Sequence, residues 1–151
     1  MKLAEALMER ADRNRRLQEL RERIVRNAKH QEGEAPAENP VELLEEYQTV
    51  SAEFERLVVR INKTNNQVAL EDGRLMVAAL SHREVLKSRH SLYKALAAEA
   101  TPRQDRYSQK EIKFVSAVDI KEIQEQADQL AKTYRELDTL IQQANWSNEL
   151  I

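Results

Sequence analysis

The chain contains no cysteine, which excludes disulfides, thiolate metal ligands and thiol nucleophiles. Only two glycines and three prolines occur among 151 residues, so the sequence offers few turns and no Gly-rich loop that binds phosphate. Aromatic residues make up 5% of the chain, so its core must be aliphatic. Because 33% of the residues are charged and turn formers are scarce, the composition is typical of long helices. We therefore expect an all-α fold in a single helical domain over residues 1–151.

Long hydrophobic runs are also absent. No segment approaches the roughly 18 apolar residues that a membrane span requires. Charges at Lys2, Glu5 and Glu9 interrupt the region where a signal peptide would carry its apolar stretch. The net charge of −2 gives no general attraction to nucleic acid or to anionic lipid. With the lack of cysteine, these features lead us to expect a cytoplasmic protein.

Apolar residues recur at alternating spacings of three and four near the C-terminus, a pattern typical of a coiled-coil seam. Asp119 is a suitable N-cap for this helix, and Glu122 occupies the third helical position. We expect a helix over about 119–145 that buries its seam against other helices. The seam consists of Ile120, Ile123, Ala127, Leu130, Tyr134, Leu137, Ile141 and Ala144.

The N-terminal part of the chain predicts a long antiparallel helical hairpin over about residues 2–68. Its first helix extends from Lys2 to about Gln31, where Gly33 provides a stop, and its second helix begins with Asn39 as N-cap and Pro40 at the first position. Residues 1–30 carry nine basic and five acidic side chains, whereas residues 31–60 carry two basic and eight acidic ones. We expect these opposite charges to face each other across the hairpin.

Two further segments complete the prediction. Residues 75–100 have helical spacing and form the third helix, so the domain is a coiled-coil bundle with two helices beyond the hairpin. Residues 102–118 form an irregular or β-like insert, a loop or short strand, and the strand would pair with residues 67–70. Ser108 with Glu111 also fits a capping box, so a short helix is the alternative.

The three histidines do not predict a metal site. His82 and His90 are two helical turns apart, about 12 Å, which is too far to share one metal ion within the chain. The sequence contains no G-x-S-x-G, no H-E-x-x-H and no E-x-x-H motif. We expect no catalytic residues, no metal and no cofactor, and therefore a protein that is not an enzyme.

The lengths of the predicted helices indicate that the chain associates with other copies of itself. Hairpin arms of about 45 Å cannot bury both sides of their seams within one chain, so we expect a homo-oligomer, a dimer or larger. Its other protein partners are not identifiable from the residues. The candidate interface residues lie on the last helix and the tail that follows it: Tyr134, Leu137, Ile141, Trp146 and Leu150.

A polar segment between the third and fourth helices is the candidate binding loop, because function concentrates on loops that rigid elements hold. Its candidate residues are Arg103, Asp105, Arg106 and Tyr107. The alternative is a polar cluster in which one arginine pairs with Asp105 while Tyr107 packs. The basic first helix also suggests nucleic-acid binding, but its acids at offsets of three and four favour intrahelical pairs.

Several motifs resemble those of an uncharacterised bacterial family of about this length, some of whose members are labelled septicolysin. They are Asn27–Glu34, Leu70–Gly73, Arg103–Ser108 with Glu111–Val115, and Ala144–Trp146 with Glu149–Leu150. The resemblance covers essentially the whole chain and implies an all-helical, coiled-coil-containing protein with no established catalytic residues. The sequence departs from the family at Leu75–Val77, where we expect polar Thr or Asp.

The function that these observations favour is a non-enzymatic, oligomer-forming coiled-coil protein that acts as a structural or protein-interaction module. The septicolysin label implies a first alternative, a membrane-active pore-forming cytolysin, since amphipathic helices can refold into pores. Nucleic-acid binding through the first helix is the second alternative. We therefore expect the chain to associate with itself, in preference to a membrane or a nucleic acid.

Overall fold

The computed structural model describes residues 1–102 and 112–151, and most of these residues are helical. The order is α1 (Leu3–Arg26), α2 (Pro40–Asn65), α3 (Met76–Ala100) and α4 (Ile120–Ser147). Within the described residues, the β-structure amounts to isolated bridges such as that between Lys2 and Glu149. The all-α fold class predicted from the sequence is confirmed.

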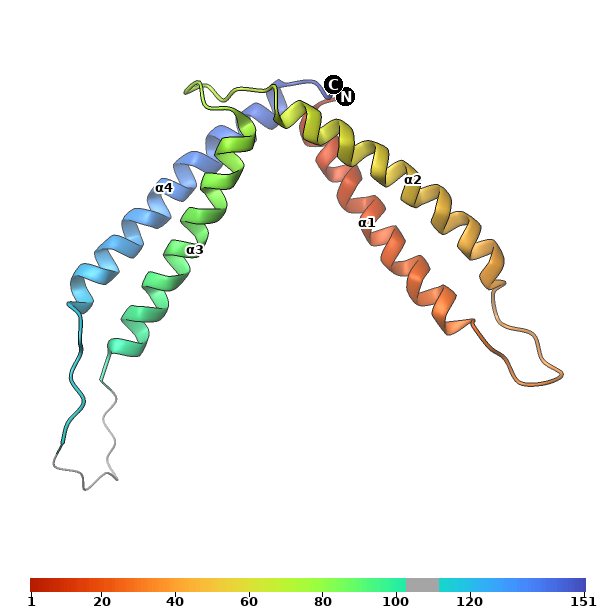
Figure 1. The fold of residues 1–151 in the computed structure, drawn as a ribbon, viewed down its shortest axis with the longest axis horizontal. Helices are drawn as coiled ribbons and strands as arrows, with labels where there is room; N and C mark the ends of the chain where they lie inside the picture. Colours follow the sequence, from red (N-terminus) through yellow and green to blue (C-terminus); the bar gives the residue numbers. More distant parts are fainter. Residues whose placement is uncertain (103–111) are drawn as a thin grey trace. The chain divides into compact units, whose positions relative to one another are not determined.

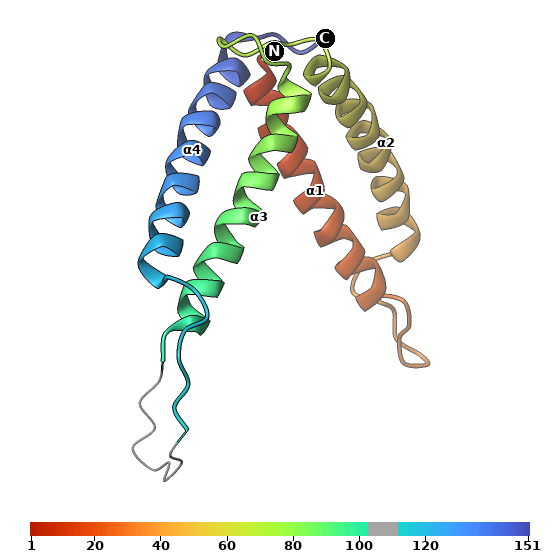
Figure 2. The ribbon, with the colours of Figure 1, turned by 60° about the vertical axis from the view of Figure 1, so that its left-hand side comes forward.

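The chain divides into two compact units. The first unit comprises residues 1–69 and 143–151, and the second comprises residues 70–142. Each unit is built on one pair of helices: α1 lies beside α2 in the first, and α3 lies beside α4 in the second (Figures 1 and 2). The sequence predicts a single domain over residues 1–151, and within it the structure groups the helices into these two units.

The first unit contains the predicted hairpin. Aliphatic side chains from α1 and α2 fill its core, with Leu20 and Ile61 almost fully buried. Basic residues of α1 form ion pairs with acidic residues on α2 or just before it, which confirms the predicted charge arrangement. These ion pairs are Arg13–Glu53 (3.6 Å), Arg16–Glu46 (2.5 Å) and Arg23–Glu38.

Helix α1 ends at Arg26, about five residues before the predicted end. The buried side chain of Asn27 explains this early end: its Nδ2 donates to the carbonyl of Arg23 (2.8 Å), and its Oδ1 accepts from the N–H of Glu38 (3.0 Å). Gly33, the predicted stop, lies in the following loop, where its φ of 85° permits the turn closed by the N–H of Glu34. The side chain of Asn27 thus ends α1 several residues before Gly33.

The predicted N-caps of α2 and α4 are confirmed. The Oδ1 of Asn39 accepts a hydrogen bond from the N–H of Val41 (3.0 Å), and Pro40 occupies the first helical position. The Oδ1 of Asp119 accepts from the N–H of Glu122 (3.2 Å). The amide of Asn39 and the carboxylate of Asp119 each accept a hydrogen bond from a backbone N–H that has no partner inside its helix.

In the second unit, α3 and α4 bury apolar side chains spaced at three and four residues. Leu86 from α3 and Leu137 from α4 are both buried. Arg83 joins the two helices through an ion pair with Asp138, with 2.6 Å between Nη1 and Oδ1. The seam of α4 is therefore a packed face, as its spacing predicted.

The insert before α4 is a loop over its described residues. Residues 112–118 form no strand, and Ile112, Phe114 and Val115 are exposed. The expected pairing with residues 67–70 is wrong, because the N–H of Leu70 donates instead to the carbonyl of Arg74 (2.8 Å) across a local turn. The alternative helix at Ser108–Glu111 lies outside the described residues.

The C-terminal tail is tied into the first unit. The N–H of Leu3 donates to the carbonyl of Asn148, and the N–H of Leu150 donates to the carbonyl of Met1, both at 2.9 Å. The N–H of Ile151 donates to the hydroxyl of Thr64 (3.0 Å). Helix α4 continues to Ser147, so Trp146 belongs to its last turn and not to the tail as predicted.

Candidate interaction surface and the pocket between α3 and α4

The five predicted interface residues differ in their exposure. Leu137, Ile141 and Leu150 are buried within the chain itself, and Tyr134 is half-buried. Trp146 has 55% of its surface exposed. Since a side chain that is already buried has little surface left for another molecule, the α4 seam serves mainly to pack the chain.

The candidate binding-loop residues Arg103, Asp105, Arg106 and Tyr107 lie outside the described residues.

Helix α3 carries two apolar faces. The inner face is buried or half-buried and includes Met76, Ala79, Leu86 and Ala97. The outer face repeats the same alternation of four and three residues but is exposed throughout. We call these six exposed residues the outer stripe of α3: Ala78, Ser81, Val85, Ser88, Leu92 and Ala95.

The two faces point in nearly opposite directions around the helix. At about 100° per residue, the outer stripe is centred roughly 155° from the inner face that packs within the unit. The inner face therefore leaves the outer stripe unobstructed along α3. The spacing of residues 78–95 is the sequence signal for the stripe, but the larger apolar residues of the inner face obscure it.

The outer stripe differs from the solvent-facing sides of the other helices in lacking charge. Val85 and Leu92 expose 55% and 64% of their surfaces, and the other four positions are alanine or serine. By contrast, the solvent-facing side of α4 carries Lys121, Glu125 and Lys132. An uncharged, exposed stripe of about 27 Å on a chain in which 33% of the residues are charged is typical of a contact surface.

A shallow hollow lies along this face. Its volume is about 520 Å³, and it is lined by Glu84, Lys87, Ser88, Ser91, Leu92 and Ala95. Small side chains form its floor beside the larger Leu92. This alternation of large and small residues gives the surface both a projection and a recess.

Two charged residues flank the stripe, and neither is used in an ion pair within the described part of the chain. Glu84 lies beside Val85 on one edge, and Arg89 lies beside Ser88 on the opposite edge; both are exposed. Neither residue forms an ion pair with any other residue that the structure describes, whereas Arg83 on the inner side pairs with Asp138. The positions directly beside the stripe thus carry one such charge of each sign, while the exposed Lys87 lies farther around the helix.

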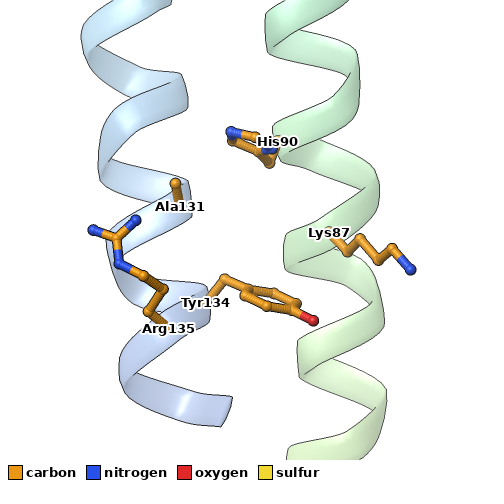
Figure 3. A pocket seen from close by; sticks show the side chains of 5 residues that line it. All are labelled: Lys87, His90, Ala131, Tyr134 and Arg135. Carbon is orange, nitrogen blue, oxygen red and sulfur yellow. The ribbon is translucent and has the colours of Figure 1, made fainter. Parts of the chain in front are cut away.

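A separate pocket lies between α3 and α4. It has a volume of about 350 Å³ and is lined by Lys87, His90, Ala131, Tyr134 and Arg135. Figure 3 shows His90 extending from α3 toward α4 and Tyr134 extending from α4 toward α3, whereas Lys87 and Arg135 point away from the space between the helices. The charged ends of these two side chains do not converge on a common point. The five lining residues include no carboxylate that would orient His90 for proton transfer.

Ligands for a metal ion do not gather in the described part of the chain, where no three His, Asp or Glu side chains are close enough to hold one. His82 and His90, which the sequence placed two turns apart, differ in setting. His82 is exposed, with Nδ1 3.3 Å from Nη1 of Arg74, and His90 is half-buried beside the pocket.

Three carboxyl groups have pKa values below their ordinary range because basic residues donate hydrogen bonds to them. Arg23 lowers the pKa of Glu38, Arg74 lowers the pKa of Asp72, and Lys2 lowers the pKa of Glu149. All three lie in ion pairs that fix loops or chain ends. The lowered pKa values of these three carboxyl groups therefore reflect structural ion pairs. None of the three groups lies on the outer stripe.

Comparison with known proteins agrees with the architecture. Residues 10–150 match the Family of unknown function (DUF6847). The chain belongs to this family. A similar crystal structure is that of a functionally unknown conserved protein from Corynebacterium diphtheriae, which is 46% identical, with a TM-score of 0.93 over 100% of this chain and 99% of that one. Among curated proteins, none matches the chain.

These findings bear on the septicolysin resemblance. Neither the description of DUF6847 nor that of the Corynebacterium protein refers to a cytolysin. None of the helices in the described ranges, 1–102 and 112–151, is both long and apolar enough to cross a membrane. The bacterial family of unknown function is supported, and the septicolysin label finds no support in these comparisons.

Proposed function

We propose that this DUF6847 member is a non-enzymatic, cytoplasmic protein-interaction module whose chains associate with one another through α3. The observation that carries this proposal is the uncharged outer stripe of α3, which the chain itself leaves exposed. Burying such a face removes apolar surface from water, at roughly 25 cal/mol for each Å². The proposed contact surface of the homo-oligomer is therefore on α3, and not on the α4 seam that the sequence indicated.

The remaining geometry is consistent with a binding role. The pocket beside His90 lacks a carboxylate among its lining residues, and the carboxyl groups whose pKa is lowered, Glu38, Asp72 and Glu149, belong to structural ion pairs. The chain contains no cysteine that could act as a nucleophile. The outer stripe, by contrast, needs only a complementary surface.

The experiment compares two substitutions at equally exposed apolar positions on different helices. Leu92 on the outer stripe and Val25 on α1 both expose 64% of their surfaces. In sedimentation velocity, we expect Leu92→Glu to weaken self-association at least about tenfold, because it buries a charge in the contact. Val25→Glu controls for the added charge and should associate like the unmodified protein. Equal effects of the two variants would contradict the proposal.

Two alternatives from the sequence have direct tests. Pore formation predicts release of dye from anionic liposomes by the purified protein. Nucleic-acid binding through α1 predicts retention on tRNA that weakens with salt, but Arg13, Arg16 and Arg23 are already paired with glutamates of the same unit. Either positive result would favour its alternative over self-association.

A further inference from the structure

We infer that the partner of the outer stripe is α3 of a second copy of this chain, lying parallel and in register. This inference rests on the proposed function and specifies its geometry. In a two-stranded coiled coil, the two seam positions of each heptad are named a and d, and the flanking positions are named e and g. The outer stripe places Val85 and Leu92 at a, and Ser81, Ser88 and Ala95 at d.

The charges at the flanks decide the orientation. With this assignment, Glu84 is a g residue, and Arg89 is the e residue of the following heptad. In a parallel pair, a g residue faces the e residue five positions later on the other helix. Glu84 therefore faces Arg89 of the second copy, and the two-fold symmetry repeats the pair on the other side.

An antiparallel pair loses this match, because there e faces e and g faces g. The e positions are His82, Arg89 and Leu96, so Arg89 would meet one of these residues and never Glu84. The g positions are Val77, Glu84, Ser91 and Ala98, and none of them is basic. Glu84 would therefore face no cation at the g position of the antiparallel partner. Only the parallel arrangement pairs both unpaired charges.

The same charges argue for a second copy over an unrelated protein. A glutamate and an arginine five residues apart are complementary to the same sequence on a parallel helix, and each chain supplies both partners. Besides Glu84 and Lys87, the hollow beside Leu92 is lined by Ser88, Ser91 and Ala95, three small residues that leave room for an apolar side chain of the facing helix. The outer stripe and its flanks are thus complementary, in charge and in shape, to the same surface of a second copy.

Cysteine crosslinking tests the orientation, and the absence of native cysteine makes each result unambiguous. Ser81 and Ala95 lie near opposite ends of the stripe, about 21 Å apart along the helix. In a parallel pair each meets its own copy, within the Cα separation of about 7 Å that a disulfide allows. We expect Ser81→Cys and Ala95→Cys to form disulfide dimers separately under mild oxidation. Lys132→Cys on the exposed side of α4 is the control that should not.

Charge exchange tests the ion pairs. Glu84→Arg and Arg89→Glu should each weaken self-association about tenfold or more, because two attractive contacts become repulsive. An equimolar mixture of the two variants should recover the affinity, since every facing pair is then of opposite sign. The double variant E84R/R89E should recover it as well.

The outcomes separate this inference from the proposed function. Crosslinking at both positions with recovery in the mixture supports the parallel pair. Self-association of the unmodified protein without crosslinking at either position overturns the geometry and leaves the proposed function standing. Absence of self-association in the unmodified protein overturns both. Circular dichroism of each variant shows whether the helices are retained, and a variant that loses helicity is replaced by Glu84→Gln or Arg89→Gln, for which we expect a smaller loss of affinity.

Discussion

Arg83 of α3 and Asp138 of α4 form the ion pair that joins these two helices, with 2.6 Å between Nη1 and Oδ1. The side chains are 23% and 34% exposed, so water screens the pair only in part. The Nε of Arg83 is buried without a hydrogen-bond partner among the described residues. Asp138 therefore compensates much of the cost of placing this guanidinium against the helix pair.

Replacing Asp138 tests this role. We expect Asp138→Asn to lower the free energy of unfolding by about 1–2 kcal/mol, because the buried part of the guanidinium loses its charged acceptor. The control is Glu136→Gln, since Glu136 is 65% exposed and forms a 3.9 Å pair with Lys132. That change should cost only about 0.3 kcal/mol. Urea titration followed by circular dichroism measures both, and equal losses would count against the account.

Asn27 provides a second test, because its side chain ends α1 and holds the following loop. Asn27→Ala removes the bonds to the carbonyl of Arg23 and the N–H of Glu38. We expect a loss of about 1–2 kcal/mol in the free energy of unfolding. Asn14→Ala is the matched control on the exposed surface of α1, where alanine should be neutral or slightly stabilising. A neutral Asn27→Ala would show that the glycine loop ends the helix unaided.

The acid sensitivity of the first unit follows from Glu38. Its pKa is lower in the folded protein than its ordinary value of 4.5, because Arg23 donates hydrogen bonds to the carboxylate. A lowered folded pKa contributes stability that is complete above pH 4.5 and is lost as the pH falls through the folded value. The stability difference between the unmodified protein and Glu38→Gln should therefore shrink below pH 4.5. Urea midpoints from pH 7 to pH 3 measure it, and a constant difference would refute the linkage.

Thr64 links α2 to the tail. Its buried hydroxyl donates to the carbonyl of Arg60 and accepts from the N–H of Ile151. Thr64→Val keeps the shape of the side chain, and we expect it to cost about 1 kcal/mol and to speed deuterium exchange at the Ile151 amide. In Thr139→Val, which removes only an exposed bond to the carbonyl of Arg135, that amide should exchange at the unmodified rate. Unchanged exchange in Thr64→Val would contradict the link.

Local signals in the sequence predicted much of the fold. The N-caps Asn39 and Asp119 and the charge pairing of the hairpin depend on residues close in sequence or on complementary periodic patterns. The end of α1 escaped prediction because Asn27 is held by Glu38, eleven residues later, in a contact that no periodic pattern encodes. The predicted short strand is absent over residues 112–118, and its expected partner Leu70 donates instead to the carbonyl of Arg74 in a local turn that strand propensity does not reveal.

The candidate surface was less predictable. Heptad spacing marks a seam but does not say whether it is buried within the chain or between chains, and Leu137 proved to be buried within it. The outer stripe of α3 carries only Val85 and Leu92 as large apolar residues, so its sequence pattern is weaker than that of the inner face. Exposure in the folded chain distinguishes the two faces.

The mass of the unmodified protein in solution tests the central claim most directly. Multi-angle light scattering over a dilution series should give twice the chain mass of 17.6 kDa at high concentration and approach a single chain on dilution. A mass of one chain at every concentration, up to hundreds of micromolar, would contradict self-association through α3.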